Sequence, residues 1–390
     1  MRILIINTDY PKFLQSLYAS DLGLADAPYD AQMAVRNDSL FGVADFYSRN
    51  FRALGHEAIE VHVNNPWLQY AWAREQTIRT SAPRPPTPGG RDVLRNLARK
   101  LGGPVRNYVR QFASRAGAIG INDWEKKILA AQIESFNPDF ILNQDTYYVR
   151  SEVLRRLKGP AKLIGQNAAV LPEGDAYAPY DLLVSSLPNY VEFFRKIGKR
   201  ADLSRLAFEP SVLEKLGPQP NRDIALSFVG SLSPEHGGRI ELLEHVAKHA
   251  PLRVWGNGIE RLPRSSPLHA LYQGEVWGRN MYNILRRSRV TLNKHINIAG
   301  NMANNMRLYE ATGMGALLLT DNQLNLNEIF LPGQQVETYS SADDCLVQIE
   351  ALLADEPNRA KIATAGQKQA IDEQNYFHRC GELVVLFEKL

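Results

Sequence analysis

The sequence predicts an α/β protein with two doubly wound domains, each a parallel sheet with helices on both faces. Short apolar runs alternate with amphipathic segments of helical length along most of the chain, which is the pattern of βαβ units. Polar residues follow most of these apolar runs. This is typical of strands that end at the ligand-binding edge of a parallel sheet. With 390 residues, the chain is long enough to bury two separate cores.

Composition excludes several other classes of protein. A hydrophobic content of 44% and a charged content of 22% are typical of globular proteins. No apolar run approaches the roughly 18 residues of a membrane-spanning helix, and the short run at residues 1–7 indicates a buried strand and not a signal peptide. Two cysteines, Cys345 and Cys380, form no disulfide framework and are typical of a cytoplasmic protein. The net charge of +3 favours no particular partner.

The N-terminal half opens with a strand over residues 1–7. We expect a long polar connection from there to about Leu40, and long loops over a strand end are often functional. A helix over 43–54 and a strand over 58–63 complete the first βαβ unit. A helix over 124–136 and three further strands continue the sheet, and Pro210–Arg222 marks a domain boundary. These strands are expected at residues 140–142, 162–164 and 181–184.

A basic insertion interrupts this half at about residues 79–115. Its first part is rich in proline and glycine, and residues 91–115 interleave arginines with leucines and other apolar residues. Two interpretations stay open: a solvated helical insertion, or a basic amphipathic segment that contacts an anionic membrane surface. Nucleic acid is disfavoured as a partner because no binding module accompanies the charge.

The C-terminal half opens with a strand over 224–229 that ends at Gly230 and Ser231. A helix near 239–249 follows, so backbone N–H groups after the strand and the helix N-terminus could bind a phosphate. An ordinary turn between strand and helix is the alternative, because neither the P-loop spacing nor GxGxxG is present. The next strand, 252–255, ends at Gly256 and Asn257, where a nucleotide base could approach the backbone.

The chain is organised around residues 290–321. A strand ends at Asn293 and Lys294, a helix carries Arg307 and Glu310 three residues apart, and a buried strand ends at Asp321. Cations neutralise phosphates, and carboxylates accept hydrogen bonds from sugar hydroxyls, so this set suits a phosphorylated sugar. An exposed ion pair is the alternative for Arg307 and Glu310. The helix is expected to carry Met302, Met306 and Tyr309 on its apolar face.

The stretch RLYEATGMGALLLTD (307–321), followed by EIFLPG (328–333), resembles the C-terminal half of the CgeB-like glycosyltransferases of the GT-B superfamily. Residues 46–73 and 179–198 resemble the family's N-terminal half, so the resemblance covers most of the chain outside the insertion. The family's glutamate before the glycine pair falls on Glu310. The second glutamate that many GT-B enzymes place eight positions later is here Leu318.

The resemblance implies two Rossmann-like domains facing a central cleft. Residues 1–215 would bind the acceptor, residues 216–372 the donor, and the helix over 373–390 would cross back to the first domain. The implied activity transfers a sugar, hexosyl by analogy, from a UDP-, dTDP- or GDP-sugar to a hydroxyl of a saccharide, lipid-linked glycan or protein, as in bacterial surface polysaccharide or glycoconjugate synthesis. A sugar-nucleotide epimerase and a non-catalytic glycan- or nucleotide-binding protein are the alternatives.

The resemblance also implies roles for individual residues. Lys294 and Arg307 would stabilise the diphosphate, and Glu310 would bind ribose or sugar hydroxyls. No two aspartates are separated by one residue, so we expect no metal and assign charge stabilisation to these cations and Arg239. The other expected donor contacts are Gly230, Ser231, Gly256, Asn257, Asn293 and Asp321.

An inverting enzyme needs a general base near the acceptor hydroxyl. Asp45, early in the first helix, is the candidate, and Asp9 is the reserve. Stabilisation of the helix N-terminus is the alternative role for Asp45. The acceptor is expected to contact Asp9–Tyr10, Arg36–Asp45 and Asn64–Asn65.

Overall fold

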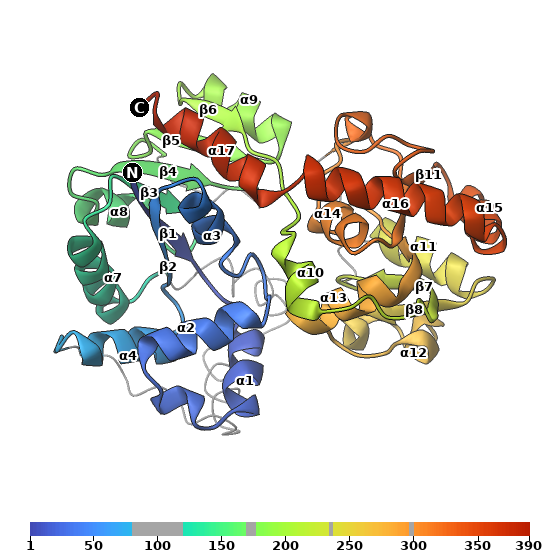
Figure 1. The fold of residues 1–390 in the computed structure, drawn as a ribbon, viewed down its shortest axis with the longest axis horizontal. Helices are drawn as coiled ribbons and strands as arrows, with labels where there is room; N and C mark the ends of the chain where they lie inside the picture. The colour runs from blue at the N-terminus through green and yellow to red at the C-terminus, as the bar shows by residue number, and fades with distance from the viewer. Residues whose placement is uncertain (80–119, 169–176, 234–236, 296–299) are drawn as a thin grey trace.

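A computed structural model of the protein describes residues 1–79, 120–168, 177–233, 237–295 and 300–390. They form two lobes joined side by side, each a parallel sheet with helices packed around it (Figure 1). From residue 80 onward, the basic insertion lies outside the described residues. The structure therefore tests neither interpretation of it. No helix in the described ranges is both long and apolar enough to cross a membrane.

The N-terminal lobe contains a six-stranded parallel sheet in the order β2-β1-β3-β4-β5-β6. Five of its strands lie close to the ranges expected from the apolar runs, and the strand over Ala201–Leu203 was not expected. The side chains of the strands are mostly buried, as in parallel sheets covered on both faces. The strands are β1 (Arg2–Asn7), β2 (Glu57–His62), β3 (Phe140–Asn143), β4 (Lys162–Gln166), β5 (Leu182–Ser185) and β6 (Ala201–Leu203). The helices are α1 (Pro11–Ser20), α2 (Tyr29–Asp38), α3 (Phe46–Ala53), α4 (Pro66–Glu75), α7 (Asp123–Phe136), α8 (Ser151–Leu157) and α9 (Pro188–Lys196), with a short 3-10 helix, η1 (Leu24–Asp26).

The expectation of a long polar connection up to Leu40 is wrong. Helices α1 and α2 occupy most of this segment. Helix α1 buries four apolar or aromatic side chains, but the buried residues of α2 are the polar Gln32 and Arg36. Because its inward face is polar, α2 lacks the apolar periodicity that predicts a helix.

The C-terminal lobe contains a five-stranded parallel sheet in the order β11-β10-β9-β7-β8. The helix expected to include Met302 begins later, at Met306, because the Asn305 side chain accepts the hydrogen bond of Leu308 N–H and caps it. The strands are β7 (Ile224–Val229), β8 (Leu252–Trp255), β9 (Ser288–Leu292), β10 (Leu317–Asp321) and β11 (Glu337–Tyr339). The helices are α11 (Gly237–Ala247), α12 (Leu268–Leu271), α13 (Gly278–Arg287), α14 (Met306–Gly313), α15 (Ala342–Ala354) and α16 (Glu356–Asp372), with 3-10 helices η3 (Ile259–Arg261) and η5 (Leu326–Glu328).

The chain passes between the lobes twice. The first passage includes α10 (Ser211–Leu216), and the second leads from α16 into α17 (Tyr376–Phe387). The two passages run side by side, since Phe208 and Asn375 form a parallel β-bridge. Helix α17 then lies on the N-terminal lobe against α3, where the Phe387 ring stacks on Phe140 with 5.0 Å between centroids (Figure 1).

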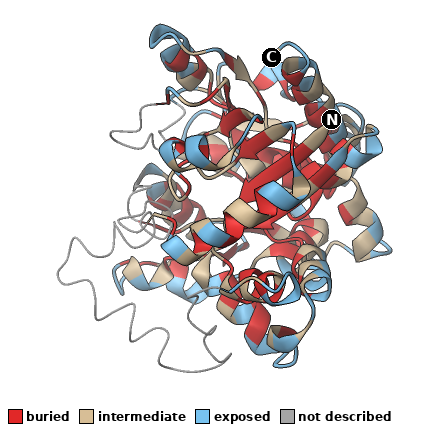
Figure 2. Cartoon of the chain, turned by 90° about the vertical axis from the view of Figure 1, so that its left-hand side faces the viewer, coloured by how far each residue is buried: buried red, intermediate tan, exposed pale blue. Residues whose placement is uncertain are grey.

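The core runs through both lobes. One continuous apolar cluster joins β1, α3 and α17 to α13 and α14, and two further clusters fill the other faces of the sheets. Figure 2 shows the central strands of the N-terminal lobe buried and the surrounding helices exposed along their outer faces. The strands of both sheets, and therefore their carboxyl ends, are held in place by well-packed cores.

Candidate functional site

The predicted donor residues converge on the carboxyl edge of the C-terminal sheet. Strand β7 lies between β8 and β9, so the chain winds from β7 to β8 on one side and from β9 to β10 and β11 on the other. Ligands of doubly wound sheets bind at such a switch point. Ser231 follows β7 here, and Asn293 and Lys294 follow β9.

Arg239 and Lys294 form the cationic part of this edge. Arg239, in α11, donates from Nη1 to Ser231 O at 3.2 Å and from Nη2 to Lys294 O at 2.8 Å, so it joins the ends of β7 and β9. Lys294 Nζ lies 3.3 Å from Asp321 Oδ2, at the end of β10. Burial lowers the pKa of Arg239 to about 10, and the nearby positive charge of Arg307 lowers it too, but the side chain stays charged at neutral pH.

Asp321 holds the loop that follows β9. Its Oδ1 accepts hydrogen bonds from the backbone N–H of His295 at 2.9 Å and lies 2.8 Å from His295 Nδ1. Burial would raise the pKa of Asp321, but the hydrogen bonds and charge of His295, with the charge of Lys294, outweigh it and hold the pKa well below its usual range. Asp321 thus stays ionised and fixes the start of the 293–295 loop. Sequence reasoning did not select His295, although it directly follows Lys294 after a strand.

Glu310 is buried and Arg307 is half-buried, so the interpretation as an exposed ion pair is wrong. Arg307 Nη1 lies 2.8 Å from Glu310 Oε2, and Arg307 Nε donates to Val229 O at 3.1 Å. Glu310 is only 6% exposed. Burial raises the pKa of Glu310, and Arg307 opposes that rise. Leu318, in the position of the second glutamate, is fully buried in β10.

The charges of this edge do not cancel. Three cations (Arg239, Lys294 and Arg307) lie beside two carboxylates (Asp321 and Glu310), which leaves one positive charge in excess. A partly buried excess of positive charge favours an anionic ligand, because the surrounding low dielectric strengthens the attraction. A phosphate or diphosphate satisfies this charge.

Gly230 and Gly256 bring two strand ends into direct contact. Gly256 has φ +143°, and a Cβ on it would lie 1.8 Å from Gly230 O. Leu232 N–H also donates to Asn257 O at 2.8 Å. The β7 and β8 turns therefore support each other through their backbones.

Asp45 is separate from these residues. It directly precedes α3 in the other lobe, where Oδ2 lies 2.8 Å from Arg49 Nη2 and Oδ1 lies 3.8 Å from Lys215 Nζ of α10. It accepts no capping hydrogen bond from the N-terminus of α3. To act as a base, Asp45 would have to leave both of these cations.

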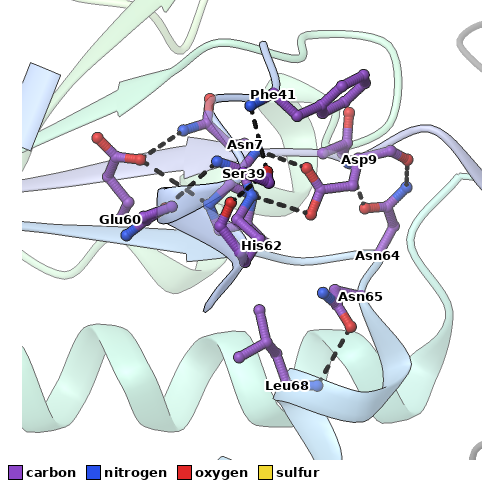
Figure 3. Close-up of polar contacts among 12 residues, drawn as sticks. Asn7, Asp9, Ser39, Phe41, Glu60, His62, Asn64, Asn65 and Leu68 are labelled. Carbon is purple, nitrogen blue, oxygen red and sulfur yellow. Dashed lines mark hydrogen bonds and ion pairs between the residues drawn. The ribbon is translucent and has the colours of Figure 1, made fainter. Parts of the chain in front are cut away.

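The reserve base, Asp9, belongs to a buried ionic cluster after β1 and β2 (Figure 3). Asp9 Oδ1 lies 2.6 Å from Arg36 Nη2, and Asp9 Oδ2 lies 3.3 Å from His62 Nδ1. Burial would raise the pKa of Asp9, but Arg36 and His62 outweigh it and hold the pKa well below its usual range. Asp9 is 1% exposed, so the expectation that it could serve as a base is wrong, and it holds the loop after β1 instead.

Glu60 completes this cluster and makes stability depend on pH. Its carboxylate accepts from Ser48 N–H at 3.1 Å and lies 3.8 Å from His62 Nε2. Sequence reasoning missed Glu60 and His62. The available signal was two ionisable residues two apart in an apolar strand, which places them on one face.

Burial raises the pKa of Glu60 to about 7, and we expect a measurable consequence. The folded state then binds a proton that the unfolded state has already lost, so the free energy of unfolding falls as pH rises from about 4.5 to about 7. Glu60→Gln should remove about 1–3 kcal/mol of that fall, since one pKa unit corresponds to about 1.4 kcal/mol. Urea denaturation at several pH values measures it.

The lowered pKa of buried His62 acts in the opposite direction, because the unfolded state binds more of its proton below about pH 6.5. The comparison of Glu60→Gln with the unsubstituted protein keeps His62 in both chains. Parallel pH profiles for the two proteins would show that Glu60 is ionised throughout.

Comparison with solved structures decides the fold. A glycosyltransferase from Rickettsia africae is matched over 100% of this chain and 98% of that chain, with a TM-score of 0.54 and 12% identity. Sucrose-phosphate synthase from Thermosynechococcus elongatus is matched over the same shares, with a TM-score of 0.57 and 11% identity. The chain has the GT-B fold. HepE of Anabaena, in complex with UDP-glucose, has this fold too and is matched over 100% of both chains, with a TM-score of 0.56 and 11% identity.

Comparison with models of protein families finds a match in the C-terminal lobe and in α17. Residues 239–384 match the model of a family described as glycosyl transferase-like. The matched range begins at Arg239 and includes the ends of β9 and β10, with Lys294 and Asp321. No curated protein matches the sequence. The more specific resemblance to CgeB-like enzymes stays a prediction.

Proposed function

We propose that this protein is a glycosyltransferase that binds a nucleotide-sugar donor at the carboxyl edge of the C-terminal sheet. The excess positive charge of Arg239, Lys294 and Arg307 at the switch point carries this proposal. The match of residues 239–384 to a glycosyl transferase-like family supports it, because the match includes these three cations. HepE, with the same fold, is known in complex with UDP-glucose, so a UDP-sugar is the first donor to test.

The proposed chemistry is displacement of a nucleoside diphosphate by an acceptor hydroxyl. Negative charge develops on the leaving diphosphate, and cations held in place beforehand stabilise it most effectively. Lys294 is held by Asp321, and Arg239 is held by two backbone carbonyls, so neither cation has to reorganise. Arg307 now lies against the Glu310 carboxylate. Glu310 would accept a hydrogen bond from a ribose or sugar hydroxyl only if the Arg307 side chain turned toward the diphosphate.

We propose that the transfer needs no metal ion, because the sequence has no pair of aspartates separated by one residue. Within the described part of the chain, no group of three or more His, Cys, Asp or Glu side chains could hold one. The N-terminal lobe is proposed to hold the acceptor. Hexosyl transfer in bacterial polysaccharide or glycoconjugate synthesis is proposed from the resemblance alone.

Nucleotide binding is the direct test of the donor site. UDP, GDP, dTDP and CMP are added separately, and the melting temperature is measured with and without Mg²⁺. We expect one nucleotide to stabilise the protein by about 2.7 kcal/mol at a hundredfold excess over Kd. Lys294→Ala should abolish most of this stabilisation, because it removes a charge-assisted contact to the diphosphate.

Lys361→Ala is the matched control, since Lys361 is an exposed lysine of α16. It should bind nucleotide as the unsubstituted protein does. Equal loss in both variants, or no loss in either, would contradict the assignment of Lys294. Incubation with UDP-glucose alone then tests the epimerase alternative, because an epimerase converts the sugar without an acceptor. Turnover of UDP-glucose only after an acceptor is added would distinguish a transferase from a binding protein.

A further inference from the structure

A cavity of about 740 Å³ lies between the two lobes. One wall is α1 with Ser39 and Phe41, and the other is the segment Glu275–Asn280 at the start of α13. Helix α1 follows β1, and α13 leads directly into β9. Helices of βαβ units run antiparallel to their strands, so both walls begin at the ligand-binding edges of the two sheets.

Aromatic rings form the inner surface of this cavity. The rings of Phe13 and Phe41 stack with 3.9 Å between centroids, and the Trp277 ring meets Phe41 edge-on at 6.0 Å. Phe13 and Phe41 are buried, whereas Trp277 is half-buried. An aromatic face that remains accessible in a cavity offers apolar contact area with little loss of conformational entropy.

The charges at the cavity are neutralised. Lys12 Nζ lies 3.5 Å from Glu275 Oε2, and Arg279 Nη2 lies 2.7 Å from Asp38 Oδ1. The cavity therefore lacks the excess positive charge that distinguishes the donor site. Its remaining polar lining consists of hydroxyl and amide side chains, namely Gln15, Ser16, Ser20, Ser39 and Asn280.

We propose that this cavity binds a neutral saccharide, the acceptor of the transfer reaction, an assignment that rests on the function proposed above. The C–H faces of a sugar ring pack on Trp277, and its hydroxyls pair with the hydroxyl and amide side chains. Neutral hydroxyl groups fit a lining whose charges are already paired, whereas a phosphate would have to break the Lys12–Glu275 or Arg279–Asp38 pair.

The site is complete only when the lobes are in contact. Arg279 N–H donates to Ser39 O at 2.8 Å, and Gly278, at φ +50°, lets the backbones meet, since a Cβ there would lie 2.1 Å from Ser39 O. The lobe contact and the saccharide site thus share Ser39 and Trp277–Arg279. A bound saccharide stabilises this arrangement because it touches both walls.

The test compares two tryptophan substitutions on exposed positions of α1. Ser16 lines the cavity and Ala19 does not, so Ser16→Trp fills the site and Ala19→Trp is the matched control. Maltotriose, lactose, mannotriose and triacetylchitotriose are tested by saturation-transfer NMR and calorimetry. We expect at least one to bind the unsubstituted protein and Ala19→Trp, and to lose about tenfold or more in affinity for Ser16→Trp, equivalent to about 1.4 kcal/mol.

Binding of none of the four saccharides, or equal binding to Ser16→Trp, overturns the proposal. So does binding of inorganic pyrophosphate that Ser16→Trp abolishes, because the cavity would then be an anion site. The melting-temperature shift with UDP, GDP, dTDP and CMP is measured on all three proteins. If one nucleotide gives a shift while no saccharide binds, the acceptor site is wrong and the donor site stands; if none of the four gives a shift, the proposed function itself fails.

Discussion

Gly256→Ala should destabilise the C-terminal lobe more than an alanine substituted for any other glycine near the candidate site. The substitution places a Cβ 1.8 Å from Gly230 O, and the backbone has φ +143°, which side-chain-bearing residues rarely adopt. Backbone strain costs about 1–3 kcal/mol, and overpacking adds about 1–3 kcal/mol. We expect a loss of about 2–6 kcal/mol in the free energy of unfolding, measured by urea denaturation.

Gly274→Ala separates these two causes. Gly274 also has a positive φ, +112°. It lies close to Gly256, because the Gly256 N–H donates a hydrogen bond to the Gly274 carbonyl. Apart from Gly274 itself and its two chain neighbours, no atom of the described residues lies within 4 Å of the position that its Cβ would take. Gly274→Ala should therefore show the strain alone and lose less stability than Gly256→Ala. Equal losses would mean that the contact between the β7 and β8 turns contributes nothing. Nucleotide binding should weaken in Gly256→Ala, since the β7 turn carries Ser231.

Most strands and the donor edge were predictable from sequence because their signals are local, whereas the short strands β6 and β11 were not expected. The runs of β7 and β10 are apolar and almost fully buried, as strands covered on both faces are. Polar residues directly follow β9 and β10 in the chain. Because parallel strands end at one edge, Lys294 and Asp321 had to lie near each other, and their distance of 3.3 Å follows from the strand pairing.

The contact between Asp9 and Arg36 in the N-terminal cluster was not predictable, because both residues are ionisable and far apart in the sequence. Arg36 lies 27 positions from Asp9, and an arginine on a helix normally indicates an exposed face. Only the fold shows that α2 turns this side chain inward toward β1. The partners of Asp45 were not predictable for a similar reason: Lys215, one of its two cationic partners, belongs to the passage between the lobes.

Arg36→Met should cost about 3–5 kcal/mol of stability near pH 8, because it leaves the Asp9 carboxylate buried without its strongest partner. In the unsubstituted protein the pKa of Asp9 lies below its unfolded value, so the pair stabilises the fold above about pH 4 and is lost as pH falls further. In Arg36→Met, burial dominates and raises that pKa. The folded variant then gains a proton as pH falls, and the difference in stability between the two proteins should shrink from pH 8 to pH 4.

The double variant Asp9→Asn/Arg36→Met distinguishes charge from packing. It removes both charges, so at pH 8 it should regain much of the stability that Arg36→Met loses, because the Asp9 carboxylate is no longer buried without its partner. Arg36 also lies over the Phe13 ring, with Cζ 5.9 Å from its centroid. If the loss in Arg36→Met were the same at pH 4 and pH 8, and the double variant recovered nothing, this contact and the packing of α2 would explain the effect. Recovery would show instead that the charge of Arg36 allows a carboxylate to be buried after β1, where it holds the loop that leads into α1 and the saccharide cavity.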